Sequence, residues 1–157
     1  MPVSFHNNDT NYRLPGGRTR AAAWLREVAR REGKLCGQVA MIFCSDATLL
    51  DMNRQFLEHD YFTDVITFDY SVEGTIGSSE GDSPAGDTIG GDIYISVDTV
   101  ARNAAIYGAT PAREMLRVVV HGVLHLCGYG DKTAAEEKKM RAKEDEYLAL
   151  YEKMNGK

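Results

Sequence analysis

The most informative pattern of apolar positions covers residues 111–128. Apolar side chains recur there every three or four residues, at Met115, Leu116, Val119, Val120, Val123, Leu124 and Leu126. This spacing predicts a helix that is mostly buried. Thr110 suits its N-cap and Pro111 its first turn, while Gly128 can end it in a left-handed conformation that other residues adopt at a cost.

The rest of the chain alternates strand patterns with helical ones. Short apolar or alternating runs predict strands at residues 3–5, 38–44, 65–68 and 91–96. Helical spacing predicts helices at residues 18–32, about 46–57, 98–107 and from Thr133 onward, where Thr133 and Glu136 form a capping-box pattern. These segments predict an α+β fold, with a mixed sheet of about four strands and about five helices.

One segment lacks the residues needed for a core. Residues 71–91 are rich in glycine, serine and acidic side chains and poor in apolar ones. That composition predicts a mobile acidic loop. We therefore expect a single domain over residues 1–157 that carries this loop, because no repeat and no second domain is indicated.

Composition narrows the setting in which the protein works. No apolar run approaches the length of a membrane span, and the first residues do not resemble a signal peptide. Cys36, Cys44 and Cys127 are odd in number and widely spaced, which favours free thiols and a cytoplasmic location. The formal net charge of −5 argues against a protein that coats nucleic acid, although local fields decide where an anion binds.

The end of the predicted central helix carries a candidate metal site. His121 and His125 lie four residues apart, so both imidazoles lie on one helix face. A chain reversal at Gly128 would return the carboxylate of Asp131 to the same point. Two nitrogens, one oxygen and an open position are typical of catalytic zinc sites, so we expect one Zn²⁺ here. Glu136 is the first alternative as third ligand.

Other interpretations of this segment stay open. A histidine pair alone is also typical of hydrogen-bonded core residues, although Gly128 and Asp131 in register favour the metal site. The spacing resembles the long zinc-protease signature His-Glu-x-x-His-x-x-Gly-x-x-His. Gly122, however, replaces the glutamate that serves those enzymes as general base, which counts against peptide hydrolysis.

The motif also resembles that of a known family. His121-Gly-Val-Leu-His-Leu-Cys-Gly-Tyr129 is similar to the His-Gly-x-Leu-His-Leu-x-Gly-Tyr motif of the YbeY family of bacterial ribosome-maturation endoribonucleases. A second block matches at Asn53, Asp60, Thr63, Asp64, Val65 and Phe68, and the resemblance extends over about residues 3–150.

The resemblance implies a metal-dependent endoribonuclease that cuts single-stranded RNA. Its role would be in maturation of the 3′ end of 16S rRNA and in ribosome quality control, with rRNA or the small subunit as partner. No membrane partner and no organic cofactor are expected. A metal-dependent hydrolase of another substrate is one rival interpretation, and a non-catalytic ribosome-associated protein is the other.

Two departures from the family pattern affect the site. Asp131 replaces the usual third histidine, and Leu57 stands where the family has an arginine thought to act in cleavage. Arg117 lies one helical turn before His121 and is the candidate catalytic cation that would bind a phosphate. The alternative for Arg117 is an ion pair with Glu114 or with an acid on another helix.

Overall fold

The structure, a computed structural model, describes residues 3–56, 63–70 and 88–156. Its sheet has the strand order β1-β2-β4-β3. The strands are β1 (Val3–Asn7), β2 (Leu35–Cys44), β3 (Val65–Asp69) and β4 (Thr88–Ser96). β1, β2 and β4 are mutually parallel, whereas β3 pairs antiparallel with β4. The predicted mixed sheet is therefore confirmed.

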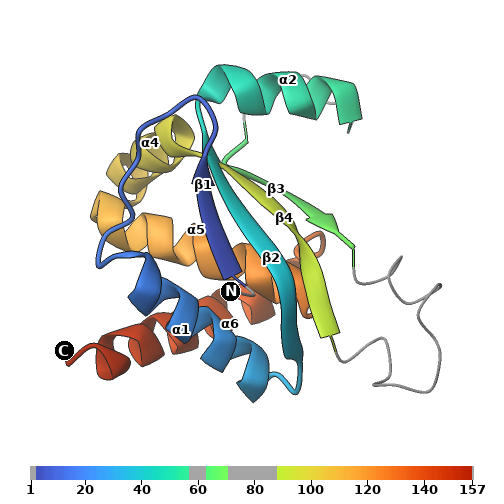
Figure 1. The fold of residues 1–157 in the computed structure, drawn as a ribbon, viewed down its shortest axis with the longest axis vertical. Coiled ribbons are helices and arrows are strands. Elements are labelled where there is room, and N and C mark those ends of the chain that lie inside the picture. Colours follow the sequence, from blue (N-terminus) through green and yellow to red (C-terminus); the bar gives the residue numbers. More distant parts are fainter. Residues whose placement is uncertain (1–2, 57–62, 71–87, 157) are drawn as a thin grey trace.

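The helices in the described part of the chain are α1 (Arg18–Arg31), α2 (Asp46–Phe56), α4 (Val97–Tyr107), α5 (Pro111–Leu126) and α6 (Ala134–Met154). Figure 1 shows α1, α5 and α6 together on one side of the sheet, with α2 beyond one end of the strands. The Trp24 indole N–H of α1 donates to the Tyr147 carbonyl of α6 at 2.8 Å, in the buried contact between the two helices. The predicted α+β class is confirmed.

The local signals at the helix ends act as the sequence predicts. The Thr110 side chain accepts a hydrogen bond from the Arg113 backbone N–H, and Pro111 is the first residue of α5. Thr133 and Glu136 form a complete capping box at the start of α6. These caps satisfy backbone N–H groups that have no partner inside the helix, so they fix where α5 and α6 begin.

The start of β4 corrects one expectation. The acidic loop was predicted to reach residue 91, where the predicted strand begins, but β4 already starts at Thr88, which pairs with Leu35, and Gly91 pairs with Val39. A Cβ on Gly91 would lie 2.2 Å from the Phe68 carbonyl oxygen, so this glycine permits close strand pairing rather than marking a loop. The remaining loop residues, 71–87, lie outside the described residues, and their mobility stays a prediction.

The structure shows the state of the three cysteines and the composition of the helices. Cys36, Cys44 and Cys127 are all free thiols, as predicted. In the part of the chain that the structure describes, no helix combines the length and apolar composition required to cross a bilayer.

Close packing at Gly122 places α5 on the sheet. A Cβ at this position would lie 2.8 Å from Cγ2 and 2.9 Å from Cδ1 of Ile93, a fully buried residue of β4. The helix can approach the strand this closely only because Gly122 has no side chain. The zinc-protease signature has a glutamate at this position. Any side chain here would push α5 away from the sheet, which is a structural reason for glycine.

Gly122→Ala is expected to destabilise the protein by about 1–2 kcal/mol, because the cost of overpacking exceeds the gain in helix propensity. Thermal unfolding measures the change. If contact with Ile93 is the cause, Ile93→Ala will cost less stability in the Gly122→Ala background than in the parent. A Gly122→Ala variant more stable than the parent would contradict this account of the packing.

Candidate metal centre and its cavity

Three predicted ligands meet where α5 ends. The Nε2 atoms of His121 and His125 lie 3.3 and 3.2 Å from the same carboxylate oxygen of Asp131. The two imidazole rings are nearly perpendicular, with centroids 4.6 Å apart. One ligand atom from each residue falls within 4.8 Å of the others, so the three side chains can hold one metal ion. Ligation itself stays a prediction.

The turn after α5 returns Asp131 to the histidines. Gly128 has φ of 111°, a left-handed conformation that favours glycine. The Tyr129 N–H then donates to the Leu124 carbonyl at 3.0 Å and closes the turn. This backbone geometry, which the sequence signal at Gly128 predicted, brings Asp131 beside the two histidines.

A second carboxylate, at the C-cap of α1, anchors the same turn. Glu32 accepts hydrogen bonds from the hydroxyls of Tyr129, at 2.7 Å, and Tyr147. Lys143 lies 3.3 Å from the same carboxylate. The turn that carries Asp131 is therefore tied to both α1 and α6.

Both imidazoles are oriented through their Nδ1 atoms. His125 Nδ1 lies 2.9 Å from the Tyr129 carbonyl, and His121 Nδ1 lies 2.6 Å from a carboxylate oxygen of Glu144. A carbonyl oxygen can only accept a hydrogen bond, so Nδ1 of His125 carries the proton and Nε2 keeps its lone pair. Acceptors behind ligating histidines are usual in metal centres, and the residues present therefore fit a divalent ion.

Glu144 is the central acid of this arrangement. It is only 5% exposed, and its other oxygen accepts from Arg117 Nη1 at 2.9 Å. Arg117 also binds the exposed Asp145 through Nη2 at 2.7 Å. Arg117 thus forms the ion pair with acids of another helix that was the alternative to a phosphate contact. Its contact with a phosphate stays a prediction.

Burial and charge shift the acid–base behaviour of the site. Burial disfavours the charged His121 imidazole, but the hydrogen bond and negative charge of Glu144 outweigh it and raise the pKa of His121. Burial also raises the pKa of Asp64 and of Glu114, the latter against the nearby positive charge of Arg117. These two carboxyl groups therefore hold a proton to higher pH than ordinary side chains do.

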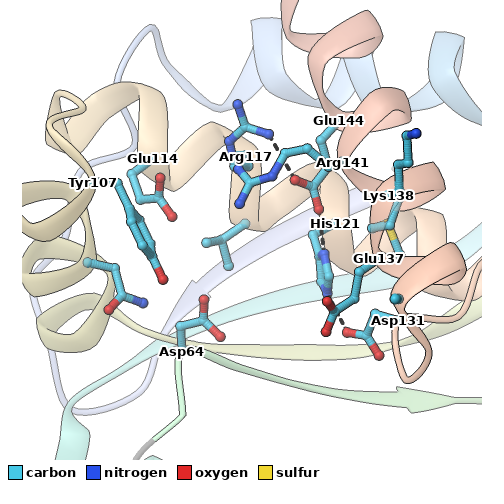
Figure 2. Close-up of a pocket in the computed structure, with 14 residues that line it drawn as sticks. Asp64, Tyr107, Glu114, Arg117, His121, Asp131, Glu137, Lys138, Arg141 and Glu144 are labelled. Atoms are coloured by element: carbon cyan, nitrogen blue, oxygen red, sulfur yellow. Dashed lines mark hydrogen bonds and ion pairs between the residues drawn. The ribbon is translucent and has the colours of Figure 1, made fainter.

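A cavity of about 740 Å³ opens beside the cluster. Figure 2 shows Tyr107 and Glu114 toward one end and Asp131 at the other, with Asp64 on the side of the sheet. The lining side chains come mainly from α4, α5 and α6 and include both His121 and Asp131. The candidate ligands therefore border a space that a substrate can enter.

The other expectations for this region have different outcomes. Glu136 is not part of the ligand cluster, because its carboxylate accepts from the backbone N–H groups of Lys132 and Thr133. Cys127 also lies outside the cluster and packs against the core. Leu57, at the position of the family arginine, lies outside the described residues.

Sequence analysis did not identify Glu144 or Asp64 as site residues. A signal for Glu144 was present: it lies four residues after Met140 and three before Tyr147, on the buried face of α6. An acid within an apolar helical stripe indicates a buried partner. Asp64 gave no such signal, since its place in the cavity depends on how β3 packs beside α5.

Comparisons with known proteins show which family the chain belongs to. The family described as "Endoribonuclease YbeY" matches residues 4–152. The chain belongs to the YbeY family. An Endoribonuclease YbeY of Phocaeicola vulgatus is 47% identical over 81% of this chain and 83% of its own length. That of Cytophaga hutchinsonii is 45% identical over 94% of both chains.

The fold is also found in a solved structure. The solution structure of TM1509 from Thermotoga maritima superposes with a TM-score of 0.60 at 25% identity, covering 97% of this chain and 90% of that one. Membership of the YbeY family confirms the resemblance drawn from the two sequence motifs.

Glu144→Gln is expected to weaken zinc affinity about 10–100-fold, because a neutral amide no longer holds the His121 imidazole as strongly. Competition with a chelating dye measures the affinity. Asp145→Asn is the matched control: it removes a neighbouring charge that also binds Arg117 but does not touch His121. Equal losses in the two variants would show that the effect is general electrostatics rather than orientation of the ligand.

Proposed function

We propose that this protein is a zinc-dependent endoribonuclease that cuts single-stranded RNA. The observation that carries the proposal is the convergence of His121, His125 and Asp131 beside an open cavity, in a chain of the YbeY family. The relatives are named endoribonucleases, which makes RNA the first substrate to test.

The finer assignment follows the family resemblance. We infer a cytoplasmic role in ribosome maturation and quality control, with the 3′ end of 16S rRNA in the small subunit as the substrate. One catalytic domain over residues 1–157 would carry this activity. Two imidazoles and one carboxylate suit zinc, which prefers nitrogen and oxygen ligands in a tetrahedral set with one open position.

The chain's own residues prepare this chemistry. A bound zinc ion would supply Lewis acidity that polarises a phosphoryl oxygen and lowers the pKa of water. Glu144 and the Tyr129 carbonyl hold the imidazoles with Nε2 toward the centre. Arg117 pairs with the buried Glu144, so that the acid behind His121 has a cationic partner.

The packing of Gly122 favours a nuclease over a peptidase. This position has no side chain to act as general base, and Ile93 fills the space that one would need. The family comparisons name no peptidase among the relatives reported above. A non-catalytic RNA-binding role is separated from a nuclease by the cleavage assay below.

Purified protein is expected to cleave single-stranded RNA, to lose this activity when a chelator removes the metal, and to regain it with added zinc. His121→Ala should abolish cleavage by removing a ligand, which excludes a contaminating nuclease as the source. RNA binding without cleavage in zinc-loaded protein would contradict the enzymatic proposal and support the binding role.

Substitutions at Asp131 test the third ligand. Asp131→Ala should sharply weaken zinc retention, as measured by elemental analysis, because one of three protein ligands is lost. Asp131→His should retain zinc and shift the pH–activity profile to lower pH, since a neutral ligand leaves the ion a stronger Lewis acid. If Asp131→Ala holds zinc as tightly as the parent, the third ligand lies elsewhere.

A further inference from the structure

The cavity beside the metal centre has an acidic lining. Five carboxyl side chains border it, namely Asp64, Glu114, Asp131, Glu137 and Glu144, against three cationic ones, Arg117, Lys138 and Arg141. A polyanion such as RNA would be repelled from this space unless a cation faces it directly. The cations that remain uncompensated therefore decide where a phosphate can bind.

Arg117 is not one of these free cations. Its guanidinium binds two carboxylates, Glu144 and Asp145, and its side chain is only 16% exposed. A phosphate would have to displace Asp145 or leave Glu144 without its partner. Breaking such a buried pair is costly, so a cation without a carboxylate partner is better placed than Arg117 to bind a phosphate.

Arg141 is free within the part of the structure that is described. It forms no hydrogen bond or ion pair with any residue there, although its positive charge offsets part of the rise that burial causes in the pKa of Glu114. Arg141 lies three residues before Glu144 on α6, so the two share a helix face. Figure 2 shows Arg141 and Lys138 on the α6 wall, close to the Glu144–His121 pair.

The end of the cavity near α4 offers a different surface. Tyr107, the last residue of α4, lines it while its side chain remains exposed, at 64%. Asn103 lies one turn earlier and lines the same end. An exposed aromatic ring suits stacking with a nucleobase, which contributes to single-strand binding without regard to sequence.

We propose that the cavity binds one nucleotide of a single-stranded RNA, with a backbone phosphate on Arg141 and a base stacked on Tyr107. This inference rests on the proposed ribonuclease function. Arg141 provides a cation from α6, beside the candidate metal centre, that no carboxylate among the described residues engages. The guanidinium can bind phosphate through two N–H groups at once, which Lys138 cannot.

The test of Arg141 is the salt dependence of RNA binding. Affinity of zinc-loaded protein for a fluorescent single-stranded 2′-O-methyl RNA, which resists cleavage, is measured between 50 and 200 mM salt. Arg141→Gln should weaken binding about tenfold. The slope of log affinity against log salt should become shallower by about 0.7, the value for one lost phosphate contact on a single strand.

Lys153→Gln is the matched control, because it removes one positive charge from α6 at a position that does not line the cavity. It should leave both the affinity and the slope unchanged. Zinc content and melting temperature should also be unchanged in both variants. An unchanged slope for Arg141→Gln, or an equal change for Lys153→Gln, overturns the phosphate assignment.

The proposed stacking of a base on Tyr107 is tested by RNA affinity at constant salt slope. Tyr107→Ala should weaken binding about fivefold or more without changing the salt slope, and Tyr107→Phe should bind like the parent. Equal binding by Tyr107→Ala and the parent overturns the stacking assignment. If the parent neither binds nor cuts single-stranded RNA, the proposed function fails; if the parent cuts RNA and the variants behave like it, only the nucleotide site fails.

Discussion

The buried carboxylate of Glu144 joins the two helices that make the candidate site. One oxygen binds Arg117 and the other binds His121, both from α5, while Glu144 itself belongs to α6. An unpaired carboxylate at this depth would cost several kcal/mol, so the acid is stable only while both partners are in place. The orientation of the His121 imidazole and the contact of α5 with α6 at this point therefore depend on one buried carboxylate.

The surrounding fold holds this group in position. Gly122 lets α5 lie directly against Ile93 of the sheet, and the capping box at Thr133 fixes the start of α6. Glu32 fixes the turn between α5 and α6, because its carboxylate accepts a hydrogen bond from the hydroxyl of Tyr129. The same tyrosine accepts the His125 N–H through its carbonyl, so the turn orients one histidine while Glu144 orients the other.

What could be predicted from the sequence was mostly local. The periodicity of α5, its cap at Thr110 and the spacing of His121 and His125 each depend on neighbours within a few residues, and the structure confirms the helix and brings the histidines together. Gly128 signalled the reversal that returns Asp131. Loop composition misled at residues 88–90, which belong to β4, because a glycine required by close strand pairing looks the same in a sequence as one in a loop.

The residues that were missed depend on contacts between distant segments. Glu144 lies 23 residues after His121, and only the packing of α6 on α5 brings the two together. The choice of Arg117 as the phosphate-binding cation rested on its place in the helical row, which cannot show that Glu144 and Asp145 already engage it. Asp64 belongs to a sequence block that matches the family, but its place in the cavity depends on how β3 packs beside α5, which the block does not reveal.

The central claim is that His121, His125 and Asp131 bind one metal ion through atoms already oriented by the protein. A crystal structure of the zinc-loaded protein tests it most directly. The account predicts one ion bound by Nε2 of both histidines and a carboxylate oxygen of Asp131 at roughly 2.0–2.2 Å, with Glu144 still on Nδ1 of His121. Zinc bound through Nδ1, or at a site without Asp131, would contradict it.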